Sequence, residues 1–128
     1  MIINRNIGMI ETFHVEVSGV PARLHPSVIH EVVSIGSEAL RNAFRHACAK
    51  HIRLHFRYEA EEFRLAVVDD GTGIDPTILA KGRGEGHFGL VGMRERAKIV
   101  RGELVSWSEL GVGTRIELKL SAMDAYIS

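Results

Sequence analysis

The sequence predicts an α/β domain in which a mixed, mostly antiparallel sheet of about five strands is covered on one face by about three helices. Segments that alternate apolar and polar residues indicate strands with one buried face. A long stretch with helical period and a second, shorter one indicate helices. These patterns follow one another in the order β-α-β-β-(α)-loop-α-β-β, which is typical of a sheet with helices on one side. The 128 residues, 45% hydrophobic, suffice for one domain.

The first half of the chain supplies a strand and the long helix. Residues 1–12 have no clean period and are expected to be a linker or remnant, while residues 13–17 alternate as a strand. A helix is expected from about Ser27 to Ala47. Its apolar residues form one stripe about 120° wide at 100° per residue, and we expect this stripe to face the core: Ile29, Val32, Val33, Gly36, Leu40, Ala43, Phe44 and Ala47.

The second half supplies the remaining strands and a second helix. Residues 52–58 and 63–67 alternate, and the period of the latter directs Asp69 inward. Asp75-Pro76 is a possible start of a short helix, and residues 90–100 have a helical pattern. Residues 104–107 and 114–120 read as strands, the latter with Thr114 on its inner face. The domain is therefore expected to span residues 13–121, with residues 122–128 as a C-terminal tail.

Composition excludes several classes of partner. Sixteen basic residues balance sixteen acidic ones, so no overall field favours nucleic acid or an anionic membrane, and we expect direct contact with neither. The single cysteine, Cys48, cannot form an internal disulfide. No apolar run approaches the roughly 20 residues that cross a bilayer. We expect a cytoplasmic domain, and whether a parent protein is anchored in the inner membrane stays open.

Polar residues border the core on the long helix. Glu38, Asn42 and His46 are spaced i, i+4, i+8 and form one row beside the apolar stripe. Asn is unfavourable inside a helix, so Asn42 suggests a ligand, although a row satisfied by neighbouring loops is equally open. Asp69 is directed into the same interior, where its carboxylate could accept from the amine of a base or from backbone amides at Gly71 or Gly73.

A glycine-rich segment follows the short helix. Residues 84–89 match G-x-G-x-x-G, but no strand directly precedes them, which excludes a dinucleotide fingerprint. The accompanying segments of a protein kinase are also missing. Glycines still let backbone amides approach phosphate oxygens, and a helix beginning near Leu90 presents its positive end to the same anion. Lys81 and Arg83 could add positive charge.

These segments together resemble a known superfamily. Residues 38–47 look like the N-box of the gyrase, heat-shock chaperone, histidine kinase and MutL (GHKL) ATPases, and residues 69–73, 86–90 and 111–114 resemble its three glycine boxes in the same order. Residues 89–97 are particularly similar to sensor histidine kinases that pair with LuxR-type response regulators. The resemblance covers residues 13–121. It implies a Bergerat-type, two-layer α/β sandwich, the HATPase_c domain, that binds ATP and Mg²⁺ under a lid.

The resemblance also implies roles by position. Asn42 would hold Mg²⁺, Glu38 would be the general base, and His46 would contact nucleotide. Asp69 would read the adenine amine. The other cofactor-binding positions would be Gly71, Gly73 and Thr114 around Asp69, and Gly86, His87, Gly89 and Leu90 at the lid.

The expected function is the ATP-binding catalytic domain of a sensor histidine kinase in two-component signalling. Its γ-phosphate would be presented to a histidine on a separate, upstream dimerisation domain, and a LuxR-type regulator would follow. His30-Glu31 resembles the acceptor's His-acid pair, but lies eight residues before Glu38, about 12 Å along the helix axis. The alternative is a regulatory binding module or an anti-sigma-factor-like serine kinase with the same pocket.

Overall fold

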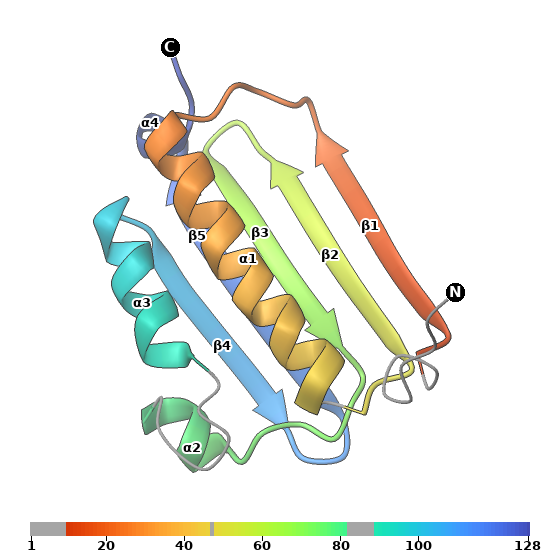
Figure 1. The fold of residues 1–128 in the computed structure, drawn as a ribbon. Coiled ribbons are helices and arrows are strands. Elements are labelled where there is room, and N and C mark those ends of the chain that lie inside the picture. The colour runs from red at the N-terminus through yellow and green to blue at the C-terminus, as the bar shows by residue number, and fades with distance from the viewer. Residues whose placement is uncertain (1–9, 47, 82–88) are drawn as a thin grey trace.

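The computed structural model describes residues 10–46, 48–81 and 89–128. These residues form one sheet with helices over one face (Figure 1). The elements in chain order are β1 (Thr12–Gly19), α1 (Pro26–His46), β2 (His51–Tyr58), β3 (Glu62–Asp69), α2 (Pro76–Lys81), α3 (Leu90–Ile99), β4 (Glu103–Glu109), β5 (Gly113–Ser121) and α4 (Ala122–Ala125). Thr12 of the expected linker already belongs to β1, and residues 1–9 lie outside the described part of the chain.

The sheet has the strand order β1-β2-β3-β5-β4. β1 and β2 are parallel and joined through α1, while the other neighbours are antiparallel. α1 and α3 lie side by side over one face of the sheet, and β1 lies beyond the edge of α1 (Figure 1). The expected fold class, a mixed and mostly antiparallel five-stranded sheet with helices on one face, is confirmed.

The buried face of α1 is rotated from the expected stripe. Val32, Gly36 and Ala43 are buried as expected, but Ile29 and Val33 are 47% and 60% exposed. The buried stripe also includes Val28, Ile35 and Ala39. The apolar arc of α1 is wider than the surface that the sheet covers, so its flank toward β1 is left uncovered. The expectation that Ile29 and Val33 face the core was wrong.

The C-terminal residues pack against the domain. Within the expected tail, residues 122–125 form α4, and Tyr126 bridges to Leu24. The Tyr126 hydroxyl donates hydrogen bonds to the carbonyl oxygens of Glu59 and Glu62, at 2.9 and 3.1 Å. Its ring stacks on Tyr58, with centroids 6.4 Å apart. These contacts close the end of the sheet where β2 turns into β3.

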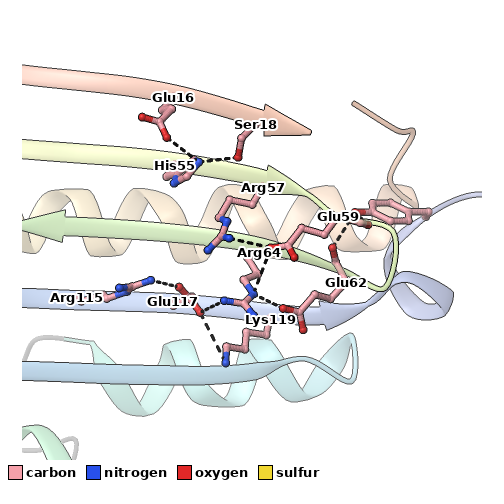
Figure 2. Close-up of polar contacts among 11 residues, drawn as sticks. Glu16, Ser18, His55, Arg57, Glu59, Glu62, Arg64, Arg115, Glu117 and Lys119 are labelled. Atoms are coloured by element: carbon pink, nitrogen blue, oxygen red, sulfur yellow. Dashed lines mark hydrogen bonds and ion pairs between the residues drawn. The ribbon is translucent and has the colours of Figure 1, made fainter. Parts of the chain in front are cut away.

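The face of the sheet away from α1 carries a network of charges (Figure 2). Glu117 is buried on β5, with the cationic groups of Arg115, Arg64 and Lys119 at 2.8, 3.7 and 3.9 Å from its carboxylate. Arg64 also forms an ion pair with Glu62. Several cations around one buried carboxylate offset the cost of removing it from water, which lets this face carry charge without a covering layer.

Candidate functional site

Several polar elements converge at one end of the sheet. β3 ends there at Asp69 and β5 begins there at Gly113. The C-terminal part of α1, the first turn of α3 and the short helix α2 lie at the same end (Figure 1). The residues that the sequence singled out on α1, β3 and β5 are therefore brought to one region from distant parts of the chain.

Asp69 occupies the inner face of the sheet, as its strand parity predicts. It is only 9% exposed, and its Oδ1 accepts a hydrogen bond of 2.8 Å from the Gly71 amide. Burial raises the pKa of Asp69, while backbone hydrogen bonds from Gly71 and Thr114 partly oppose the rise. The sequence left open whether Asp69 pairs with a ligand amine or with backbone amides. In the structure, one oxygen of the Asp69 carboxylate accepts from the Gly71 amide. The adjacent Asp70 points the other way and accepts from the amides of Lys50 and His51.

Thr114 and Ser108 form a buried hydroxyl pair beside Asp69. Thr114 is the register partner of Asp69 on β5, and its Oγ1 lies 2.8 Å from Ser108 Oγ. Ser108 Oγ also donates to the Gly113 carbonyl and accepts from the Ile74 amide, at 2.9 and 2.6 Å. Because the Ser108 proton is used on Gly113, Thr114 is the donor within the pair. The sequence analysis did not single out Ser108. Its position on β4, four residues after Leu104 and so on the same face, could have indicated that it points inward.

Two glycines allow the loops at this end to approach one another. Gly113 has φ +147°, and a Cβ there would lie 2.0 Å from the Asp69 carbonyl oxygen. Gly73 has φ +78°, and its Cβ would lie 2.3 Å from the Glu109 carbonyl oxygen. No side chain fits at either position without moving the backbone. The glycine boxes after β3 and before β5 are thus packed directly on each other, and Gly71 between them is buried.

The row on α1 reaches the start of α3. Glu38 is partly exposed and forms an ion pair with Arg41. A Cβ on Gly89 would come within 2.7 Å of Glu38 Oε1, so the N-terminus of α3 rests on the Glu38 side chain. Asn42 follows one turn later and is partly buried. His46 is the last residue of α1, and its side chain lies outside the described part of the structure.

The expected lid residues fall into two groups. Gly86 and His87 lie outside the described residues. Gly89 is the N-cap of α3 with φ +71°, and Leu90 is fully buried in the core. A cleft of ≈ 440 Å³ between α1 and α3 is lined by Glu38, Arg41, Gly89 and Arg96, among others. The α1–α3 seam is therefore open to solvent beside Glu38.

An ion pair that sequence reasoning missed ties α1 to α3. Glu31 is buried on α1, and its carboxylate lies 2.9 Å from Arg96 of α3 and 3.0 Å from the adjacent His30. The hydrogen bonds from His30 and Arg96 lower the pKa of Glu31. On the same helix, Arg94 donates to the carbonyl of Leu79 and so connects α3 to α2. Periodicity alone gave no signal for a pair separated by 65 residues.

The family described as "Histidine kinase-, DNA gyrase B-, and HSP90-like ATPase" matches residues 28–123. This chain belongs to that family. The matched residues include Asp69, Thr114 and the start of α3, which lie at one end of the sheet.

Curated relatives of this ATPase domain are histidine kinases. The signal transduction histidine-protein kinase/phosphatase DegS of Brevibacillus brevis is 36% identical over 65% of this chain and 20% of its own length. DegS of Bacillus subtilis (strain 168) is 31% identical over 77% of this chain and 25% of its own length. The chain thus spans about a quarter or less of the curated relatives that it matches.

Solved histidine kinase structures share the fold. The blue-light activated histidine kinase EL346 of Erythrobacter litoralis aligns with a TM-score of 0.70 at 22% identity, over 84% of this chain and 34% of its own. The catalytic domain of the histidine kinase ThkA aligns with a TM-score of 0.70 at 14% identity, over 91% of this chain and 82% of its own. At these identities the likeness establishes the fold of the ATPase domain.

Within the described ranges, no helix is long and apolar enough to span a membrane. The same residues contain no group of three or more His, Cys, Asp and Glu side chains that could enclose a metal ion. The site instead offers a buried carboxylate, hydroxyl groups, backbone amides at glycines and a glutamate beside an open seam. This set suits binding of a polar, partly planar ligand better than a preformed metal cage.

Proposed function

We propose that this chain is the ATP-binding catalytic domain of a sensor histidine kinase. The observation that carries the proposal is the buried Asp69 carboxylate, held by the Gly71 amide at the end of the sheet where α1 and α3 meet. Family membership supports ATP as the ligand. ATP would supply the γ-phosphoryl group, and the chain would supply positioning and charge neutralisation.

Asp69 would bind the adenine base. One of its oxygens accepts from Gly71, and a carboxylate has further lone pairs for an exocyclic amine. Gly73 and Gly113 keep the neighbouring backbone close, and Thr114 brings a hydroxyl to the same region. His46, Gly86 and His87 would contact the nucleotide from α1 and the lid, and Gly89 and Leu90 would anchor the lid to α3.

The donor set at α1 fits Mg²⁺. Asn42 has an amide oxygen and Glu38 lies one turn away, whereas the described residues form no cage of ligands. Mg²⁺ takes most of its ligands from phosphates and water, so one side-chain oxygen suffices. Asn42 would hold the ion, and Glu38, beside the open α1–α3 seam, would accept the proton of the attacking group.

We further propose that the acceptor is a histidine on a dimerisation domain that precedes this domain in the parent kinase, and that a LuxR-type response regulator receives the phosphoryl group. A cytoplasmic location follows from this role. The DegS relatives, which are longer than the matched region, support a parent protein of several parts.

Calorimetric titration tests the nucleotide site. With Mg²⁺ present, the wild type should bind ATP, and Asp69→Asn should lose at least tenfold in affinity and its preference for ATP over GTP. Asp70→Asn is the matched control, because it removes the same charge one residue away on the opposite face. Absence of binding at millimolar ATP, or equal losses in the two variants, would contradict the assignment.

The metal position is tested separately on α1. Asn42→Ala should weaken ATP binding in Mg²⁺ but change it little in excess EDTA, whereas Arg45→Ala, an exposed change on the same helix, should leave both affinities near the wild type. Unchanged Mg²⁺-dependent affinity in Asn42→Ala would remove Asn42 from the metal site.

Phosphotransfer distinguishes a kinase from a binding module. The domain is incubated with radiolabelled ATP and a dimerisation domain that carries the acceptor histidine, and the acceptor is assayed for acid-labile, alkali-stable phosphate. Glu38→Gln should abolish transfer while ATP still binds, and Glu95→Gln, exposed on α3, should not. Binding without any transfer to a histidine acceptor would favour the regulatory module.

A further inference from the structure

The strand β1 forms one edge of the sheet and exposes an unusual amount of apolar surface. Phe13, Val15 and Val17 are 47%, 53% and 54% exposed. They lie on the same face as α1, where the Phe13 ring meets the Phe44 ring at the edge of that helix, with centroids 5.5 Å apart. Long, apolar edge strands are sites of association, which most proteins blunt with charges or proline. β1 contains no lysine, arginine or proline.

The outer edge of β1 also has available backbone groups. The Thr12 amide donates to the Lys50 carbonyl, and Thr12 is in register with His51, so Thr12 directs its backbone groups toward β2. Because backbone direction alternates along a strand, Phe13, Val15 and Val17 direct theirs away from β2. No strand of the described residues lies on that side.

We propose that β1 pairs antiparallel with β1 of a second copy of this chain, about a two-fold axis at Val15. In this register Phe13 lies opposite Val17 of the second copy, and Val15 lies opposite its counterpart. All three residues then form hydrogen-bonded pairs with their outward backbone groups. The two sheets would join into one of ten strands.

Charge favours this register over the two with an axis at a neighbouring residue. On the opposite face of β1, His14 and Glu16 alternate with the apolar residues. With the axis at Val15, His14 of each copy lies opposite Glu16 of the other, whereas an axis at residue 14 or 16 would place His opposite His or Glu opposite Glu. Glu16 Oε2 lies 3.0 Å from His55 Nε2 on β2 of the same chain (Figure 2), and the carboxylate has a second oxygen for another imidazole.

The other edge of the sheet is built against such pairing. β4 begins at Glu103 and ends at Glu109, both exposed, and in its full antiparallel register with itself these two glutamates would lie opposite each other. Of the two edge strands of the described sheet, β1 is therefore the one whose charges favour pairing with itself. Because the β1 pair is antiparallel, the two Asp69 ends lie at opposite ends of the joined sheet, and nucleotide binding is left unobstructed.

The dimer is expected to be weak, since a single strand edge buries less than the roughly 1,000 Å² of a stable interface. Sedimentation of the chain with Cys48→Ser, from about 10 μM to 1 mM, should show reversible dimerisation. Glu16→Lys and His14→Glu should each weaken it at least tenfold, and the double variant should restore it to within threefold. Glu95→Lys, the same charge change on α3, should not weaken it.

Disulfide trapping tests the register. In the Cys48→Ser background, Val15→Cys should form a cross-linked dimer on mild oxidation, because facing residues in a hydrogen-bonded pair have Cα atoms about 5.5 Å apart, within disulfide range. Val17→Cys, on the same face with the same exposure, should not, because the two copies of residue 17 would be about 14 Å apart.

Three outcomes would overturn the proposal. A monomer at every concentration, for wild type and double variant alike, means that β1 has no partner of this kind. A dimerisation affinity that is the same in wild type, Glu16→Lys and His14→Glu would place the contact on another surface. Equal cross-linking of Val15→Cys and Val17→Cys would place it in another register. Equal ATP affinity in Glu16→Lys and wild type would show that the variant is folded.

Discussion

The two ends of the sheet have opposite chemistry. At one end, the buried polar groups of Asp69, Ser108 and Thr114 gather where glycines let the backbone approach closely. At the other, the rings of Tyr58, Phe63 and Tyr126 pack together and one hydroxyl satisfies two carbonyl oxygens. The comparison teaches that buried polar groups suited to binding a ligand gather at one end of this small domain. The aromatic packing at the other end stabilises the fold.

The largest effect is expected at the backbone contact of the polar end. Gly113→Ala places a Cβ at 2.0 Å from the Asp69 carbonyl, and should lower the free energy of unfolding by about 4 kcal/mol or prevent folding. Gly111→Ala is the control, because Gly111 also has positive φ (+81°) but a Cβ there would meet no atom of the described residues within 4 Å, so it should cost only about 1 kcal/mol. Urea titration measures both, and equal losses would remove the close contact as the cause.

Ser108→Ala should have the next largest effect. It leaves the Ile74 amide and the Thr114 hydroxyl without their partner at a buried position, which costs about 2 kcal/mol. Ser106→Ala, on the same strand and face, should cost less than about 0.5 kcal/mol. If the two serines prove equivalent in urea unfolding, the hydroxyl network does not stabilise this end.

Tyr126→Phe tests the opposite end. The change removes the hydroxyl that bonds the carbonyls of Glu59 and Glu62, with a cost of about 1 kcal/mol, while the ring stays packed. ATP affinity should be unchanged in calorimetry. A tenfold change in affinity would show that the two ends are coupled rather than separate in role.

The smallest effect is a pH dependence with opposite signs at Asp69 and Asp70. Burial raises the pKa of Asp69 above 3.8, so the folded state holds this proton more tightly than the unfolded state. Relative to Asp69→Asn, the wild type should therefore lose stability as pH rises from below 3.8 through the raised pKa, and stay lower above it.

Asp70 should behave in the reverse way. Slight burial raises its pKa, but hydrogen bonds from the amides of His51 and Lys50 outweigh this and lower it. Relative to Asp70→Asn, the wild type should be more stable above pH 3.8 and lose that advantage as pH falls through the lowered pKa. Urea unfolding from pH 3 to 7 measures both differences. The same sign for both residues would contradict the contrast.

Strand parity and helical period predicted much of this arrangement. The pattern placed Asp69 and Thr114 on the inner face, and the structure pairs them in register. It failed where partners come from distant elements. The burial of Glu31 depends on Arg96 of α3, and the exposure of Ile29 and Val33 depends on how α1 is rotated over the sheet, neither of which is encoded in a local period.

The candidate site shows the same limit. The glycine boxes were visible as motifs, but their direct packing at Gly73 and Gly113 appears only when β5 pairs with β3 and β4 pairs with β5. Likewise, the spacing of Glu38 and Asn42 defined a row, whereas the contact of Glu38 with Gly89 depends on how α3 is placed. The roles of the row, the lid and the adenine position remain the predictions tested above.

The C-terminal residues lie far from the candidate site, which makes them a suitable attachment point. The Ile127 amide donates to the Arg23 carbonyl, and Tyr126 forms a β-bridge with Leu24. These backbone contacts hold residues 126–127 against the segment that leads into α1. These contacts lie at the end of the sheet away from the end of β3, where Asp69 lies (Figure 1). A surface tether or fluorescent reporter attached after Ser128 would thus report on the domain without crowding its nucleotide, which suits it to immobilised binding assays.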